Sequence, residues 1–230
     1  MLWIKICGMT NSADALAAAE AGADAIGMLF APSRRRIGIE QGREIARALP
    51  QHVEKVGLFY DESASTIEAI AEEVGLTAVQ LHGEESPDFV ADLFRGDGRR
   101  SRVRVFKTIH VTEDAPPEVG PYLRGNMVDA FLLDTVVKDH VTGVVSRGGT
   151  GRTFDWSRNA ALIEQLAART HVIVAGGLSP VNVGDAVRIM HPWGVDVCSG
   201  VEREPGKKDV RKLREFVAAA RAARPAGSPG

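Results

Sequence analysis

Two reactive side chains alternate near the start of the chain, where Lys5 and Cys7 belong to a short apolar run that begins at Trp3 and stops at Gly8. A strand alternates its side chains between two faces, so Lys5 and Cys7 share one face and the isoleucines the other. A buried cysteine is common. A buried lysine is not, because an unpaired ammonium is costly to remove from water. The run therefore predicts that one face of this strand either takes part in a reaction or carries a charge that a neighbouring group neutralises.

Later apolar runs repeat this division between a polar and an apolar face. If each run is a strand, most of the polar residues fall on one of its two faces, and these faces can all point to the same side of the sheet. The polar positions are Gln80, His82, Lys107, Asp134, Asp196 and Cys198. The alternate positions, such as Phe106, Leu133 and Val195, are apolar, as expected for side chains that pack under helices. This coherence predicts that the polar groups lie together.

The elements that must position these groups alternate between strand and helix. Strands are predicted at residues 3–7, 25–30, 55–60, 78–83, 103–109, 130–134, 172–177 and 194–200. Helices are predicted at 12–21, 40–49, 64–74, 87–94, 157–169, about 180–191 and 208–224. Such alternation favours a parallel sheet with helices outside, and about eight units fit a closed (β/α)₈ TIM barrel. We predict this α/β fold as a single domain over residues 1–224, with 225–230 a disordered tail. A doubly wound open sheet is the alternative, although no nucleotide-binding fingerprint is found.

Closure of a barrel makes the first and last strands neighbours. It therefore places Lys5 beside Asp196, and we predict a buried ion pair, because either charge alone would be costly inside a barrel. The site of such a barrel lies at the carboxyl ends of its strands. Cys198 is expected to face the interior near Cys7.

Glycine clusters end the last strands and the loop before them. In barrels the last loops often bind phosphate through backbone N–H groups, and glycine lets the backbone approach an anion closely. The candidate phosphate-binding residues are Gly149, Thr150, Gly151, Gly176, Gly177, Ser199 and Gly200.

Composition excludes several classes of protein. The 230 residues are 44% hydrophobic and 25% charged with a net charge of −2, so no basic surface for nucleic acid is expected. No apolar run approaches the ~20 residues of a membrane span, and Lys5 interrupts the pattern of a signal peptide. Two cysteines without a CxxC motif argue against a disulfide framework or a zinc site. We predict a cytoplasmic protein with no metal, nucleic-acid or membrane partner.

Six short blocks, spanning nearly the whole chain, carry a resemblance to a known family. They are Lys5-Ile6-Cys7-Gly8-Met9-Thr10, Val79-Gln80-Leu81-His82-Gly83, Leu132-Leu133-Asp134-Thr135, Gly148-Gly149-Thr150-Gly151 with Phe154-Asp155-Trp156, Ala175-Gly176-Gly177-Leu178, and Ser199-Gly200-Val201-Glu202 with Pro205-Gly206-Lys207-Lys208-Asp209. In this order they resemble phosphoribosylanthranilate isomerase of tryptophan biosynthesis. The resemblance implies a cofactor-free barrel that converts N-(5-phosphoribosyl)anthranilate to 1-(2-carboxyphenylamino)-1-deoxyribulose 5-phosphate by an Amadori rearrangement.

The resemblance also implies roles for individual residues. Cys7 matches the family's general base, Asp134 its general acid, and Arg35, or alternatively Arg36, the group that holds the anthranilate carboxylate. Asp134 would protonate the furanose ring oxygen, and the thiolate of Cys7, favoured by nearby Lys5, would remove the C2′ proton. The expected partner is a phosphorylated sugar–anthranilate, and the protein is expected to be a monomer or homodimer.

Three further residues are candidate substrate contacts, namely Lys5, His82 and Asp196. Each also has a structural explanation, since Lys5 and Asp196 can pair and His82 can hydrogen-bond within the protein. The role of the loop at 136–147 stays open.

The alternatives include a histidine-pathway or dual-substrate phosphosugar isomerase, which tends to use paired carboxylates where this chain has Cys7. An indole-glycerol-phosphate synthase would need a lysine acid, for which Lys107 is the candidate. A phosphate-binding barrel without catalysis is a third.

Overall fold

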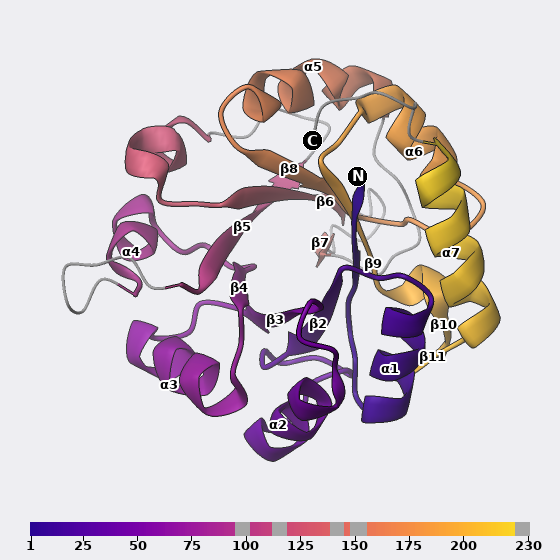
Figure 1. The fold of residues 1–230 in the computed structure, drawn as a ribbon. Coiled ribbons are helices and arrows are strands. Elements are labelled where there is room, and N and C mark those ends of the chain that lie inside the picture. Colours follow the sequence, from indigo (N-terminus) through magenta and orange to yellow (C-terminus); the bar gives the residue numbers. More distant parts are fainter. Residues whose placement is uncertain (95–101, 112–118, 139–144, 148–155, 224–230) are drawn as a thin grey trace.

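The computed structural model describes residues 1–94, 102–111, 119–138, 145–147 and 156–223, and eight parallel strands among them close into a barrel inside a ring of helices (Figure 1). In order around the barrel the strands are β1 (Trp3–Ile6), β2 (Ala25–Leu29), β3 (Glu54–Phe59), β4 (Ala78–Leu81), β5 (Arg104–Val111), β6 (Ala130–Lys138), β8 (His171–Val174) and β9 (Gly194–Val197). Strand β9 pairs with β1, and β5 pairs with β6, so no edge of the barrel stays open. The predicted (β/α)₈ barrel is confirmed, and the open-sheet alternative is wrong.

The helices cover the outside of this barrel. They are α1 (Ser12–Glu20), α2 (Ile39–Ala48), α3 (Ala64–Val74), α4 (Pro87–Asp92), α5 (Trp156–Ala167), α6 (Val183–Met190) and α7 (Val210–Ala223), with a 3₁₀ helix η1 (Gly120–Asn126) between β5 and β6. Local sequence explains their ends. The side chains of Asn11 and Ser63 accept hydrogen bonds from the first turns of α1 and α3, and Gly75 ends α3 in the left-handed conformation with φ of 76°. None of the helices within the described ranges is long and apolar enough to cross a membrane.

Side-chain alternation divides the core into two layers. An inner cluster fills the barrel and includes Trp3, Ala25, Phe106 and Ile173, while a larger cluster lies between the sheet and the helices. The outward-facing residues predicted on β1, β4, β6 and β9, such as Leu133, belong to the outer cluster.

The predicted face of β5 is wrong. Phe106 lies inside the barrel, whereas Lys107 is buried on the outer side, where its Nζ donates to the Gly83 carbonyl at 2.7 Å and pairs with Glu85 at 2.9 Å. The prediction followed the polar side chain, but a carboxylate from the β4–α4 loop neutralises the ammonium there. Thr108 is instead the polar inward residue.

Three segments differ from the prediction. Helix α6 begins at Val183 and not near residue 180, because the Asn182 side chain accepts from the Ser179 N–H at 2.8 Å and holds a turn before the helix. Helix α7 begins at Val210, after a hairpin of β10 (Glu202–Glu204) and β11 (Lys207–Lys208) that the sequence did not predict. Strand β7 (Val145–Arg147), antiparallel to β6, was also not predicted. The tail 225–230 lies outside the described residues.

The ion pair predicted across the closing seam is present. Lys5 and Asp196 are directly paired in the register of β1 and β9, and the Lys5 Nζ lies 2.9 Å from Asp196 Oδ2. The Lys5 side chain is wholly buried. Burial alone would lower the pKa of Lys5, but the charges of Asp196 and Cys7 raise it above its ordinary value, so the ammonium stays charged. The seam is thus held by a buried salt bridge as well as by backbone hydrogen bonds.

Replacing Lys5 with methionine is expected to lower the free energy of unfolding by about 3–5 kcal/mol, because it leaves the Asp196 carboxylate without its cation. Urea denaturation measures this loss. The matched control is Lys207→Met, which breaks an exposed pair with Glu204 and should leave the free energy of unfolding nearly unchanged. Equal effects of the two substitutions would show that the buried pair contributes no more than a surface one.

Candidate active site

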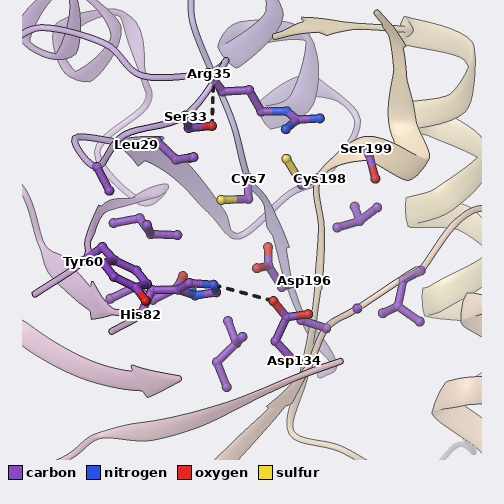
Figure 2. A pocket seen from close by; sticks show the side chains of 18 of the residues that line it. Cys7, Leu29, Ser33, Arg35, Tyr60, His82, Asp134, Asp196, Cys198 and Ser199 are labelled. Carbon is purple, nitrogen blue, oxygen red and sulfur yellow. Dashed lines mark hydrogen bonds and ion pairs between the residues drawn. The ribbon is translucent and has the colours of Figure 1, made fainter. Parts of the chain in front are cut away.

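A cavity of about 450 Å³ opens at the carboxyl ends of the barrel strands. It is lined by Cys7, Leu29, Ala31, Pro32, Ser33, Arg35, Leu58, Tyr60, Gln80, His82, Leu132, Asp134, Ala175, Gly176, Gly177, Leu178, Asp196, Val197, Cys198 and Ser199. Figure 2 shows side chains from both halves of the chain directed into this space. The cavity therefore lies where strand alternation in a barrel predicts the site.

Cys7 enters the cavity directly after β1. It is buried, and its backbone N–H donates to the Val197 carbonyl of the neighbouring strand at 2.8 Å. The neighbouring Cys198 thiol lowers the pKa of Cys7 to about 7, in spite of burial, which raises it. The positive charge of Lys5 lowers this pKa further. A substantial fraction of Cys7 is therefore thiolate near neutral pH, as a base requires.

Asp134 lies in the same cavity, on β6, and is almost fully buried. Its Oδ2 is 3.8 Å from the Nε2 of His82 (Figure 2). The other ring nitrogen of His82 lies 3.1 Å from the Thr108 hydroxyl and 3.4 Å from the Gln80 amide nitrogen. His82, directly after β4, is thus held by these contacts with its Nε2 toward Asp134.

Of the consecutive arginines after β2, Arg35 is the one that reaches the cavity. Its guanidinium lines the cavity and forms a forked pair with Glu202, with Nε 2.9 Å from Oε1 and Nη2 2.6 Å from Oε2. The hydrogen bonds that Arg35 donates to Glu202 raise the pKa of Arg35, so the guanidinium stays charged. The Nη1 group takes no part in this fork. Arg36, in contrast, is exposed and does not line the cavity.

The predicted phosphate-binding residues are only partly brought together. Gly176, Gly177 and Ser199 line the cavity. Gly200 does not, but a Cβ built on it would lie 2.0 Å from the Leu178 carbonyl oxygen, so the loops after β8 and β9 can meet only at a glycine. Gly149, Thr150 and Gly151 lie outside the described residues.

Two buried charges near the site were not singled out from the sequence as site residues. Glu202 binds Arg35, and Lys208 donates from Nζ to Glu202 Oε1 at 3.0 Å and to the carbonyls of Cys7 and Cys198 at 2.6 and 3.1 Å. Both come from the β10–β11 hairpin, whose Pro205-Gly206 turn between charged residues was its only local indication. The hairpin therefore ties the end of β1 to the end of β9 and places a counter-ion on Arg35.

Comparison with known proteins agrees with this geometry. A family model described as N-(5'-phosphoribosyl)anthranilate (PRA) isomerase matches residues 4–219. The N-(5'-phosphoribosyl)anthranilate isomerase of Pelobacter propionicus is 43% identical over 225 residues, which are 97% of this chain and 98% of that protein.

Solved structures of such isomerases superpose over most of the chain. The crystal structure of phosphoribosyl anthranilate isomerase from Thermotoga maritima has a TM-score of 0.81 and 37% identity, over 96% of this chain and all of that one. A second, in complex with reduced 1-(o-carboxyphenylamino)-1-deoxyribulose 5-phosphate, has a TM-score of 0.78 and 36% identity with the same coverage. The chain therefore belongs to the N-(5'-phosphoribosyl)anthranilate isomerase family.

Proposed function

We propose that the protein catalyses the Amadori rearrangement of N-(5'-phosphoribosyl)anthranilate to 1-(2-carboxyphenylamino)-1-deoxyribulose 5-phosphate in tryptophan biosynthesis. The observation that carries the proposal is that Cys7 and Asp134 line one cavity of about 450 Å³, which suits a small phosphorylated substrate. Membership of the family indicates the reaction, and Cys7 and Asp134 would supply the base and the acid that it needs.

The reaction needs two proton transfers at different atoms of the sugar. Asp134 donates a proton to the furanose ring oxygen, the C1′–O bond breaks, and the ring opens to a Schiff base. The Cys7 thiolate then removes the C2′ proton, giving an enolamine that tautomerises to the ketone. The lowered pKa of Cys7 supports its role, because a base is most effective when its pKa is near the working pH.

The phosphate and the carboxylate of the substrate would be bound by two different kinds of hydrogen-bond donor, backbone N–H groups and a guanidinium. Backbone N–H groups at Gly176, Gly177 and Ser199 support a phosphate site, since these residues line the cavity at strand ends. Arg35 would hold the anthranilate carboxylate through Nη1 and the remaining N–H of Nη2, because its Nε–Nη2 edge is paired with Glu202 and a guanidinium has a second edge of paired donors. Arg36 is the weaker candidate, since it lies outside the cavity.

Asp196 would accept a hydrogen bond from a sugar hydroxyl. It lines the cavity, its Oδ2 pairs with Lys5, and its Oδ1 is a buried oxygen that has no hydrogen-bond partner within the described part of the chain. A buried oxygen of this kind is costly unless a ligand satisfies it. Lys5 then acts by fixing Asp196, and His82 acts beside Asp134 as a hydrogen-bonding group.

The alternative barrels find less support at these positions. A synthase that used Lys107 as its acid is disfavoured, since that ammonium is buried outside the barrel against Glu85. An isomerase with paired carboxylates is disfavoured because Cys7 stands at the end of the first strand.

Complementation of a tryptophan auxotroph that lacks this step tests the proposal. The chain should restore growth without tryptophan, and its Cys7→Ala variant, expressed at the same level, should not. Failure of the unaltered chain, together with no turnover of the purified protein on N-(5'-phosphoribosyl)anthranilate, would reject the isomerase and leave a binding barrel.

The rate should depend on pH through Cys7. Because Cys7 acts as thiolate, kcat/KM should rise with pH and level off above its pKa of about 7. Near pH 6 it should be roughly a tenth of the plateau, since about a tenth of the thiol is then ionised. A pH–rate profile measures this limb, and a flat profile across this range would contradict the assignment of the base.

The protein is proposed to be cytoplasmic and to be a monomer or a homodimer. A cytoplasmic location suits a reaction that depends on a free thiolate, because a reducing compartment keeps thiols unpaired. A monomer or a homodimer is expected, and sedimentation of the purified protein distinguishes them.

A further inference from the structure

The two cysteines of the chain face each other across the seam that closes the barrel. In the register of β1 and β9, Lys5 pairs with Asp196 and Ile6 with Val197, so the next pair is Cys7 and Cys198. The 2.8 Å hydrogen bond from the Cys7 N–H to the Val197 carbonyl extends the pairing to this point. Paired residues on adjacent strands lie about 5 Å apart, within reach of two side-chain sulfurs. Figure 2 shows both sulfur atoms in the same part of the cavity wall.

The backbone around the pair is fixed on both sides. The buried Lys208 ammonium binds the carbonyls of Cys7 and Cys198 together, at 2.6 and 3.1 Å. On the other side, Gly8 has a φ of 78°, and a Cβ built there would come within 2.7 Å of both Cys198 Sγ and Arg35 Cδ. The Cys198 sulfur and the Arg35 side chain therefore both pack against Gly8, where a larger residue would displace one of them.

We propose that Cys198 is a positioning residue, whose thiol donates a hydrogen bond to Cys7 and holds the Cys7 sulfur as a thiolate directed into the cavity. This inference rests on the proposed function, in which Cys7 is the base. The mechanism itself does not require Cys198, because the base and the acid are both supplied without it.

The surroundings give the two thiols different proton affinities. The hydrogen bond from Cys198 and the charge of Lys5 lower the pKa of Cys7, while the hydrogen bond to Cys7 and burial raise the pKa of Cys198. A Cβ built on Gly27 would lie 2.7 Å from Cys7 Sγ and 3.0 Å from Lys5 Cε, so the Lys5 side chain lies beside Cys7, and its charge favours Cys7 as the acceptor and Cys198 as the donor. The arrangement increases the thiolate fraction at neutral pH and lets burial exclude water from the base.

The test measures the ionisation of Cys7 without substrate. The rate of its alkylation by iodoacetamide is followed against pH, with mass spectrometry of the Cys7 peptide so that reaction at Cys198 is counted separately. The variants are Cys198→Ala, which removes the donor, and Cys198→Ser, whose hydroxyl can donate from the same position. Cys198→Val replaces the alanine variant if thermal unfolding shows that the latter is not folded.

In the unaltered protein the alkylation midpoint should lie near pH 7. The alanine or valine variant should move it upward by about one unit or more, with a roughly tenfold slower reaction at pH 7, and the serine variant should restore most of the shift. The acid limb of kcat/KM should move by the same amount. An unchanged midpoint in the alanine or valine variant, or an equal shift in the serine variant, would overturn the proposal.

The outcomes separate this inference from the function on which it rests. A shifted midpoint in a protein that has no isomerase activity would reject the function and leave the pair of thiols intact. Isomerase activity with an unshifted midpoint would reject only the role of Cys198.

Discussion

Replacing Cys7 with alanine is expected to lower kcat by about 10³-fold or more while the barrel stays folded. The C2′ proton then has no base, and general base catalysis typically accounts for about 10²–10⁴ in rate. Cys7 is buried, but its loss removes a single sulfur atom, so the free energy of unfolding should fall by only about 1 kcal/mol. Steady-state kinetics and urea denaturation measure the two effects.

The control for Cys7 is Cys7→Ser, which preserves size and hydrogen bonding but replaces the thiol with a hydroxyl that does not ionise near neutral pH. It should be about as inactive as the alanine variant, since the charge and not the volume is needed. If either variant kept kcat within about tenfold of the unaltered protein, the base would have to be another group.

Asp134→Asn should lower kcat by about 10²–10⁴-fold, because an amide of the same shape has no acidic proton to give to the ring oxygen. The substitution keeps the side chain's size inside the cavity, and binding of the phosphate and carboxylate ends should persist. The expected result is a loss in kcat with little change in KM.

A matched substitution for Asp134 is Asp129→Asn, because Asp129 directly precedes β6, the strand that carries Asp134. The Oδ2 of Asp129 accepts a hydrogen bond from the Val105 N–H at 2.8 Å. It lies outside the catalytic cavity, and an amide oxygen can accept the same bond, so kcat should be unchanged. Similar losses from the two substitutions would indicate damage to the fold and not removal of the acid.

Strand alternation accounts for most of what could be predicted from the sequence. Once the chain is a closed barrel, the positions of Cys7, Asp134 and Asp196 on their strands fix which way they face. The Lys5–Asp196 pair followed from the same reasoning, because closure makes the first and last strands adjacent. Local rules also gave the ends of helix α3, since Ser63 and Gly75 are strong caps.

The contacts that could not be predicted come from loops that meet only in the folded chain. Neither the pairing of Arg35 with Glu202 nor that of Lys107 with Glu85 has a local pattern, since the partners are remote or come from irregular segments. Polarity alone assigns Lys107 to the inside of the barrel, a position that Phe106 occupies in the structure. A nearby carboxylate makes the opposite face acceptable to a charge.

The seam between β1 and β9 has a consequence for how the protein is made. Lys5 is 191 positions from Asp196, and the Lys208 ammonium reaches back 201 positions to the Cys7 carbonyl. Contacts this distant in sequence form late, because a long stretch of chain must be ordered first. A nascent chain that has not yet emerged beyond β11 therefore has Cys7 and Lys5, but it lacks Lys208, which holds the Cys7 carbonyl. Activity should appear only after Lys208 has been synthesised and has reached the seam.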